Sequence, residues 1–267
     1  MRAILTIVFL LPAVLLAVLP ADAAGLPPGF VYLRDIDPSI AQDMRYAGDD
    51  NFTGHPLPGY SAPECVLRRD VAVALSKVQA DLASIAHDPE KWKPVFGKDH
   101  APGERLGLKV YDCYRPARAV AAFARWARQG EDGATRRFYP KLDKRTLFDG
   151  YIAAHSAHST GNAVDLTLVK LPPAPAPPYD PAARYGPCTA PADQRAPDNA
   201  LDMGTGFDCL DPKSSAFAST TTAAQNHARV VLLEAMRKRG FRNYIREWWH
   251  FSFGTRGQAY DVPIGAR

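Results

Sequence analysis

One long stretch of the chain repeats apolar residues with the period of an α-helix. Within residues 66–86, the apolar positions that follow this period are Val71, Leu75, Val78, Leu82 and Ile85. The spacing predicts a helix with one core-facing stripe, which ends before Pro89.

Two further helices are predicted from the residues at their ends. Residues 116–129 begin with Pro116, which suits the first position of a helix, and Gly130 follows as the expected C-terminal cap. Residues 222–239 end in three basic residues, which the helix dipole favours at a C-terminus, and Gly240 comes next. We therefore expect helices over both ranges.

Alternation of apolar and polar residues predicts strands elsewhere. In residues 163–168, Val164, Leu166 and Leu168 lie on one face, and Asp165 lies on the other face between Ala163 and Thr167. Residues 106–114 and the aromatic segment 248–253 are also predicted as strands. Residues 25–64 are rich in proline and glycine, so we expect irregular structure there.

Residues 171–202 are rich in proline and alanine. Proline can neither pair inside a sheet nor continue a helix, so this segment is predicted to be a surface insertion. An insertion at this point could lie over a neighbouring cleft and restrict the size of a ligand.

Composition predicts an ordinary globular protein. The 267 residues are 46% hydrophobic and 22% charged, which is enough for one sizeable core or two small ones. The net charge is +4 and no long run of like charge occurs, so we expect no nucleic-acid partner.

The N-terminus predicts export. Arg2, an apolar segment over residues 4–19 and the small residues Ala21 and Ala23 fit a signal peptide that is cut after Ala23. The alternative is an uncleaved membrane anchor, which the prolines and small residues near the cut disfavour. We therefore expect residues 1–23 to be a signal peptide and residues 24–267 to be exported, to the periplasm, without a stable membrane anchor.

Export changes the interpretation of the four cysteines. Cys65, Cys113, Cys188 and Cys209 could form two disulfides in any of three connectivities. Proximity in sequence favours Cys188–Cys209, which leaves Cys65–Cys113. No C-x-x-C spacing occurs, so neither a redox motif nor a cysteine zinc site is indicated.

Two distant segments carry candidate metal ligands. The first contains His158 and Asp165, and the second is Glu247-Trp248-Trp249-His250. Two imidazoles and one carboxylate are enough for a catalytic zinc ion, which holds three protein ligands and keeps the fourth position for water. The alternative for each histidine is a structural role, such as a core imidazole bonded to backbone.

Glu247 remains over as a candidate base. In a regular strand, Glu247 and His250 would point to opposite faces. We therefore expect Glu247 at a strand end or bulge, where its carboxylate can turn toward the metal and take a proton from water.

Arg115 is a candidate for stabilising negative charge. It precedes a proline, which favours an extended conformation, and so it ends the strand where the next helix begins. A guanidinium fixed at such a junction can face a cleft and donate to a developing oxyanion. The alternative is a surface arginine in a salt bridge.

These motifs resemble the D-alanyl-D-alanine dipeptidases, the VanX-like branch of the zinc D-Ala-D-Ala peptidases. The resemblance includes Ser156-x-His158-x-x-Gly161-x-Ala163-x-Asp165, the downstream Glu247-Trp248-Trp249-His250, Tyr46 with residues 50–54, residues 111–116, and Phe207-Asp208. It extends over most of residues 30–264, with interruptions near 88–105 and 171–201. Cys113 stands where the family pattern has glycine.

The resemblance implies a role for each matching residue. His158, Asp165 and His250 would bind one zinc ion per chain, Glu247 would be the general base, and Arg115 would stabilise the oxyanion. Asp208, with Tyr46 and Ser156, would hold the free N-terminus of a small D,D-dipeptide. The implied fold is an α+β single domain of the Hedgehog/DD-peptidase type, with a small antiparallel sheet that carries the zinc site and with flanking helices.

The implied activity is hydrolysis of D-Ala-D-Ala to two D-alanines in cell-wall peptide turnover. One alternative is a zinc D,D-carboxypeptidase that acts on peptidoglycan stem peptides. An alternative of another class is a non-catalytic, zinc-containing module that binds cell-wall peptides. The sequence gives no oligomeric state.

Overall fold

The computed structural model describes residues 25–84, 105–131, 133, 135–255 and 257–266. The expected signal peptide, residues 1–23, and the predicted end of the first helix beyond residue 84 lie outside these ranges. No helix within the described ranges has the length and hydropathy that crossing a bilayer requires.

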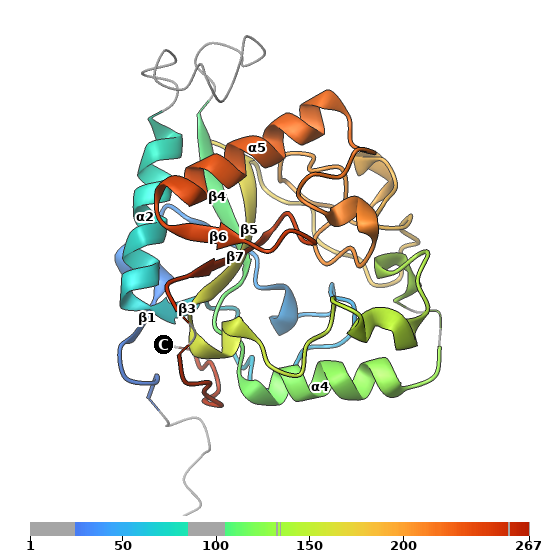
Figure 1. Ribbon diagram of the computed structural model, residues 1–267, viewed down its shortest axis with the longest axis horizontal. Helices are drawn as coiled ribbons and strands as arrows, with labels where there is room; N and C mark the ends of the chain where they lie inside the picture. Colours follow the sequence, from blue (N-terminus) through green and yellow to red (C-terminus); the bar gives the residue numbers. More distant parts are fainter. Residues whose placement is uncertain (1–24, 85–104, 132, 134, 256, 267) are drawn as a thin grey trace, which may run out of the picture.

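A five-stranded sheet lies at the centre, with the strand order β2-β4-β5-β7-β6 (Figure 1). Its strands are β2 (Ala41–Gln42), β4 (Leu106–Asp112), β5 (Ala163–Lys170), β6 (Phe241–Asn243) and β7 (His250–Phe253). The β4–β5, β5–β7 and β7–β6 pairs are antiparallel, but β2 pairs in parallel with β4.

The sheet is therefore mixed, and the expectation of a purely antiparallel sheet is wrong at this edge. The two residues of β2 belong to the N-terminal segment that was expected to be irregular. A two-residue strand is too short to show alternation, so the sequence pattern could not reveal it.

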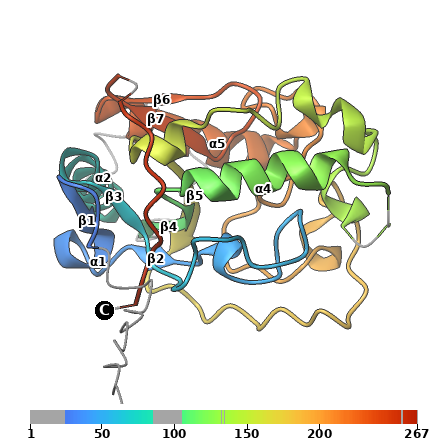
Figure 2. The ribbon, with the colours of Figure 1, turned by 90° about the horizontal axis from the view of Figure 1, so that it is seen from below.

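Two helices, α2 (Arg69–Ala83) and α5 (Ala223–Lys238), contact the sheet and each other, with α2 against β4 and α5 against β5 and β6 (Figure 1). The third long helix, α4 (Ala117–Arg128), lies on the opposite side of the molecule from α5 in Figure 1, and it faces the viewer in Figure 2, where the molecule is seen from below. Its Phe123 packs on Phe52 at 4.6 Å between ring centroids, and its Trp126 packs on both Phe52 and Tyr139. This arrangement leaves the second face of the sheet to loops.

The shorter elements are β1 (Phe30–Tyr32), α1 (Leu33–Ile36), β3 (Val66–Arg68) and the 3₁₀ helices η2 (Arg45–Ala47), η4 (Arg136–Phe138), η5 (Lys144–Phe148), η6 (Ala157–Thr160), η7 (Ala192–Gln194) and η8 (Pro212–Ser214). Strands β1 and β3 form a separate antiparallel pair. The first predicted helix thus begins three residues late, because Val66 and Leu67 are buried in this pair instead.

The predicted strands 106–114, 163–168 and 248–253 are confirmed as β4, β5 and β7, with shifted ends. The predicted helix 222–239 is confirmed as α5. Thr222 caps it in a reciprocal capping box with Gln225, and Gly240 follows with a φ of +90°.

The two ends of α4 differ from the prediction. Pro116 is the N-cap, with an extended ψ of 141°, and it is not the first helical residue. At the other end, Gln129 leaves the helix in an extended conformation, with φ −73° and ψ 158°. Because the chain does not turn through the left-handed region there, Gly130 has no capping role.

Both predicted disulfides are present, Cys65–Cys113 and Cys188–Cys209. The second ties the middle of the proline-rich segment, at Cys188, to the body of the protein. Residues 172–184 are mostly exposed, as predicted for a surface insertion.

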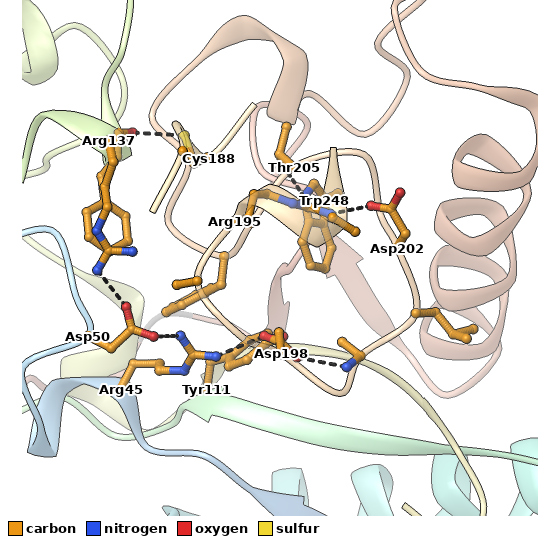
Figure 3. A pocket seen from close by; sticks show the side chains of 18 residues that line it. Arg45, Asp50, Tyr111, Arg137, Cys188, Arg195, Asp198, Asp202, Thr205 and Trp248 are labelled. Atoms are coloured by element: carbon orange, nitrogen blue, oxygen red, sulfur yellow. Dashed lines mark hydrogen bonds and ion pairs between the residues drawn. The ribbon is translucent and has the colours of Figure 1, made fainter. Parts of the chain in front are cut away.

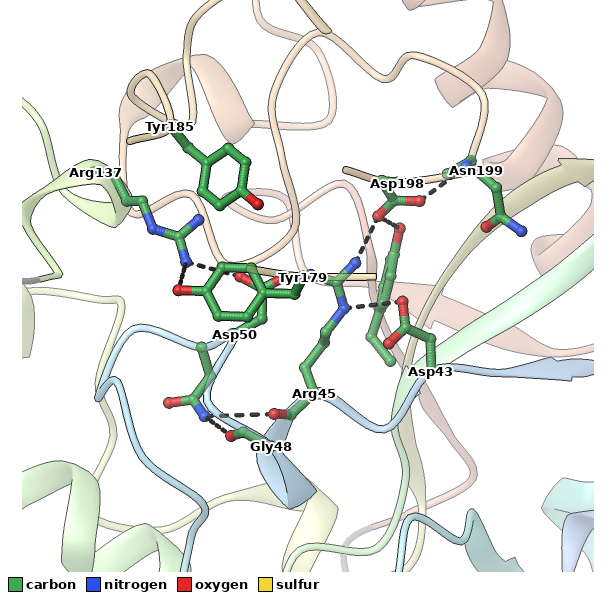
Figure 4. A network of polar contacts seen from close by, with 12 residues as sticks. Asp43, Arg45, Gly48, Asp50, Arg137, Tyr179, Tyr185, Asp198 and Asn199 are labelled. Carbon is green, nitrogen blue, oxygen red and sulfur yellow. Dashed lines mark hydrogen bonds and ion pairs between the residues drawn. The ribbon is translucent and has the colours of Figure 1, made fainter. Parts of the chain in front are cut away.

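The rest of the proline-rich segment is anchored through Asp198 (Figure 4). This carboxylate accepts hydrogen bonds from Arg45 at 2.8 Å, Lys109 at 2.5 Å and Tyr111 at 2.7 Å. Arg45 also pairs with Asp50, so the anchor is a charge network rather than a single contact. The segment is therefore at the surface throughout, as predicted, with Cys188 as its buried residue, and its second half is held to the body of the protein by these charges.

Candidate metal centre and cleft

Three candidate metal ligands converge on the loop-covered face of the sheet. His158 lies in η6, Asp165 on β5, and His250 at the start of β7, where the strand register pairs it directly with Asp165. Between the first two, Gly161 has a φ of +72°, and a Cβ there would lie 2.3 Å from the ring of Phe30. This glycine lets the chain turn tightly from η6 into β5.

The ligand atoms of this set all lie within 4.8 Å of one another. His158 Nε2 is 3.0 Å from His250 Nδ1 and 3.3 Å from Asp165 Oδ1, and His250 Nδ1 is 2.9 Å from the same oxygen. Two ligand atoms on a tetrahedral ion with bonds of about 2.0–2.1 Å lie about 3.3 Å apart. The spacing and the donor types therefore fit a divalent metal ion.

A hydrogen bond to the backbone fixes the orientation of the His158 ring. Its Nδ1 donates to the carbonyl oxygen of Cys113 at 2.7 Å. A carbonyl can only accept, so the proton lies on Nδ1, and the lone pair of Nε2 faces Asp165 and His250. Burial first raises the pKa of Asp165, but the two imidazoles outweigh it and hold that pKa well below its ordinary value.

Arg115 lies beside this set. It pairs with Asp112 at 2.7 Å and with Asp165 at 3.4 Å, and its guanidinium lies 5.0 Å from the ring centre of Tyr46. Its side chain is 11% exposed, so it is not the surface arginine of the alternative interpretation.

Asp112 and Tyr60 complete this group and were missed in the sequence. Asp112 is fully buried, accepts from Tyr60 Oη at 2.6 Å and from Arg115 Nε at 2.8 Å, and lies 3.4 Å from His158 Nδ1. The one available signal was an acidic residue three positions before Arg115, at the end of a predicted strand. One carboxylate thus contacts both the arginine and a candidate ligand.

Glu247 lies in the turn between β6 and β7, outside any regular strand. Its backbone N–H donates to Tyr244 at 2.9 Å, and its carbonyl accepts from His250 at 3.3 Å. In a regular strand, Glu247 and His250 would point to opposite faces. Because Glu247 lies in the turn, both side chains line the same cleft, as expected. Burial, then the charges of Asp165 and Asp208, raise the pKa of Glu247 well above its ordinary value, while Arg115 opposes the rise.

Asp208 and Tyr46 form a buried pair that lines the same cleft. Tyr46 Oη donates to Asp208 Oδ2 at 2.7 Å. Asp208 has a φ of +56°, a left-handed conformation that aspartate tolerates better than most residues. Its neighbours hold it there, since Phe207 stacks on Tyr111 at 4.5 Å and Cys209 is in a disulfide.

Burial, followed by the negative charge of Asp165, raises the pKa of Asp208 well above its ordinary value. The hydrogen bond from Tyr46 and the charge of Arg115 act in the opposite direction. A cationic group beside Asp208 would further favour the ionised carboxylate.

Ser156 has a local role and a position in the cleft. Its Oγ accepts from the backbone N–H of His158 at 3.2 Å, which caps η6. The same side chain also lines the cleft.

A single cleft of about 630 Å³ contains every candidate residue proposed from the sequence. These residues are Tyr46, Arg115, Ser156, His158, Asp165, Asp208, Glu247 and His250. No residue of 171–202 lines it among the described parts of the chain, so the suggestion that the insertion covers this cleft is wrong.

The insertion instead borders a second, smaller cavity of about 80 Å³ (Figure 3). Arginine and aspartate side chains lie opposite one another in it, and Arg195 pairs with Asp202 while Arg137 pairs with Asp50. The guanidinium charges of this cavity are therefore neutralised by neighbours.

A converging set of two histidines and one aspartate, beside a glutamate of raised pKa and an arginine in one cleft, defines a metal-dependent hydrolase.

Comparisons with known proteins agree with this class. A family model described as D-ala-D-ala dipeptidase matches residues 193–265, a range that includes Asp208, Glu247 and His250. A D-alanyl-D-alanine dipeptidase of Streptomyces coelicolor is 34% identical over 240 residues, which cover 88% of this chain and 98% of that protein. A protein of the same name from Enterococcus faecalis is 31% identical over 225 residues, which cover 84% of this chain and 90% of that protein. Another, from Escherichia coli, is 28% identical over 234 residues, which cover 88% of each.

The chain belongs to the D-alanyl-D-alanine dipeptidase family of metallopeptidases.

Proposed function

We propose that this protein is an exported, zinc-dependent dipeptidase that hydrolyses D-Ala-D-Ala to two D-alanines. The observation that carries the proposal is the convergence of His158, Asp165 and His250 within 4.8 Å, in the same cleft as Glu247. The names of three relatives, each a D-alanyl-D-alanine dipeptidase, support this choice of substrate. The finer fold type that we propose is the Hedgehog/DD-peptidase arrangement.

Zinc is the metal that this donor set suits best. Two imidazoles and one carboxylate leave an open position, as in catalytic zinc sites. When bound, the metal would supply Lewis acidity, which polarises a carbonyl group and makes water more acidic. His158, Asp165 and His250 would hold it, and the bond from His158 to the Cys113 carbonyl would keep one ligand aimed.

Asp208 and Tyr46 bind the ammonium group of the dipeptide in this proposal. Tyr46 donates to one oxygen of Asp208, which leaves the other oxygen to accept from an ammonium group. Ser156, which lines the same cleft, is a further polar contact for the substrate. A longer peptide has no ammonium group at this point, so a free dipeptide is preferred.

Glu247 takes the proton from the attacking water and passes it to the leaving amine. Burial and the neighbouring carboxylates raise the pKa of Glu247, which makes its carboxylate a stronger base than an ordinary glutamate. Arg115 stabilises the negative charge that develops on the carbonyl oxygen. Asp112 holds the guanidinium in place, because its Oδ2 accepts from Arg115 Nη2 at 2.7 Å and from Arg115 Nε at 2.8 Å.

The location of the protein is part of the proposal. Residues 1–23 fit a signal peptide, and two disulfides are typical of proteins in oxidising compartments. The substrate would then be D-Ala-D-Ala that is released from the cell wall. Mass spectrometry of the secreted protein tests the cleavage site, because a cut after Ala23 leaves Ala24 as the first residue.

The direct test is incubation of the mature protein with D-Ala-D-Ala, with and without a chelator, followed by measurement of free D-alanine. We expect release that the chelator abolishes and zinc restores. A pentapeptide stem that ends in D-Ala-D-Ala is the competing substrate, and faster cleavage of the stem would identify a D,D-carboxypeptidase instead. Zinc binding without cleavage of either substrate would indicate a binding module.

A further inference from the structure

The strand register places Arg242 on the same face of the sheet as the candidate metal ligands. Asp165 lies opposite His250, and Arg242 lies opposite Ser252. Residues that face each other across antiparallel strands point to the same side, as do His250 and Ser252, two positions apart. Arg242 is thus the diagonal neighbour of His250, at a backbone distance of about 7–8 Å.

Arg242 also keeps its charge available. It lines the cleft, is exposed, and donates to the carbonyl oxygen of Gly254. Among the described residues, no carboxylate lies within ion-pair distance of it. Arg115, the other arginine of the cleft, already pairs with Asp112 and Asp165. A carbonyl leaves the positive charge uncompensated, so Arg242 can still bind an anion.

The position of Arg242 complements that of Asp208. Asp208 is held from the β4 side, where the adjacent Phe207 stacks on Tyr111. Arg242 is on β6, at the other edge of the strand order β2-β4-β5-β7-β6, with the candidate ligands on β5 and β7 in between. A dipeptide whose ammonium group lies at Asp208 and whose peptide bond lies over the ligands therefore extends its C-terminus toward β6.

We propose that Arg242 binds the C-terminal carboxylate of the substrate, an inference that rests on the proposed dipeptidase function. Asp208 then binds the ammonium group of the dipeptide and Arg242 binds its carboxylate, on opposite sides of the peptide bond that is cut. Arg242 makes a free C-terminal carboxylate a requirement, which restricts the enzyme to the last peptide bond of a chain.

The test compares two substrates that differ only at the C-terminus, D-Ala-D-Ala and D-alanyl-D-alaninamide. The values of kcat/KM are measured for the wild type, Arg242→Gln and Arg242→Lys. A charged hydrogen bond contributes about 1.5–3 kcal/mol, which corresponds to about 10- to 160-fold. We expect Arg242→Gln to lose this factor on the free acid, mainly through KM, and to leave the amide nearly unchanged. Arg242→Lys should recover part of the loss.

Arg246→Gln is the matched control. Arg246 is exposed in the turn that follows β6 and donates to the Asp149 carbonyl at 2.6 Å, but it does not line the cleft. We expect this variant to retain the preference for the free acid.

An equal loss on both substrates in Arg242→Gln, or no loss on either, would overturn the role of Arg242 and leave the dipeptidase function intact. Failure of the wild type to cleave D-Ala-D-Ala would instead overturn the function, and the role of Arg242 with it.

Discussion

His158 donates from Nδ1 to the carbonyl oxygen of Cys113, over 2.7 Å. Cys113 is in turn cross-linked to Cys65, with 5.3 Å between the two Cα atoms. The backbone that orients a candidate metal ligand is therefore tied to the start of β3, 48 residues away in sequence. The cysteine that departs from the family pattern supports the metal centre through its main chain.

Replacing both Cys65 and Cys113 by alanine should lower the free energy of unfolding by about 2–4 kcal/mol, because the unfolded chain gains freedom. Metal affinity should fall much less, since a backbone carbonyl survives the substitution. Denaturant unfolding and metal titration measure the two effects. The matched control is Cys188→Ala with Cys209→Ala, which should leave metal affinity unchanged. A larger loss of metal affinity than of stability would contradict this assignment.

Glu247→Gln should lower kcat by a factor of about 10²–10⁴ and leave the metal in place, because the amide keeps the shape of the side chain but cannot take a proton. Steady-state kinetics with metal analysis of the same sample measures both quantities. Undiminished hydrolysis would exclude Glu247 as the base.

The pH dependence of kcat/KM should have an acid limb set by Glu247. A base works only when it is ionised, so activity falls as the pH drops through its pKa. Burial and two neighbouring carboxylates raise the pKa of Glu247, and the limb should therefore lie above about 4.3, the usual value for glutamate. A limb at the ordinary pKa of glutamate would show that the raised pKa does not persist in the working enzyme.

Asp208→Asn should raise KM for D-Ala-D-Ala and have little effect on N-acetyl-D-Ala-D-Ala, which has no ammonium group. The amide removes the negative charge that the ammonium group would contact. Tyr46→Phe should have a weaker effect in the same direction, because it removes only the hydrogen bond of 2.7 Å to Asp208. Equal losses on the two substrates in Asp208→Asn would argue against ammonium recognition.

Tyr60→Phe should reduce stability by about 1–3 kcal/mol, because it leaves the buried Asp112 carboxylate with one hydrogen bond fewer. If Asp112 positions Arg115, the variant should also lower kcat more than it changes KM. Tyr114→Phe is a control, since the Tyr114 hydroxyl donates to the Val262 carbonyl at 3.1 Å and lies outside the cleft. A loss of stability with unchanged kcat would assign Tyr60 a purely structural role.

Much of the fold was predictable where a pattern was long. Helix α5 and strand β5 followed from periodicity and end signals within one or two residues. The two-residue strand β2 and the buried Val66 were not predictable, because pairing with a distant strand decides their conformation. The prediction of a glycine cap on α4 was wrong for a local reason, because the chain leaves the helix at Gln129 without a left-handed turn.

The residues of the cleft could be chosen from their chemistry, but their supports could not. His158 and Glu247 carry groups whose presence in a pattern suggests a reaction. Asp112 and Tyr60 act through contacts between residues 52 positions apart in sequence, which only the folded chain brings together. The contacts of Asp198 could not be predicted either, because the prolines of its segment indicate only that the segment is exposed.

Asp208 is bonded directly to Cys209, whose sulfur holds the proline-rich segment. Reduction of the Cys188–Cys209 disulfide would loosen the recognition of the ammonium group and spare the metal ligands, which lie on other elements. Under the proposed function, reduction of the protein would therefore weaken dipeptide capture before it weakens metal binding.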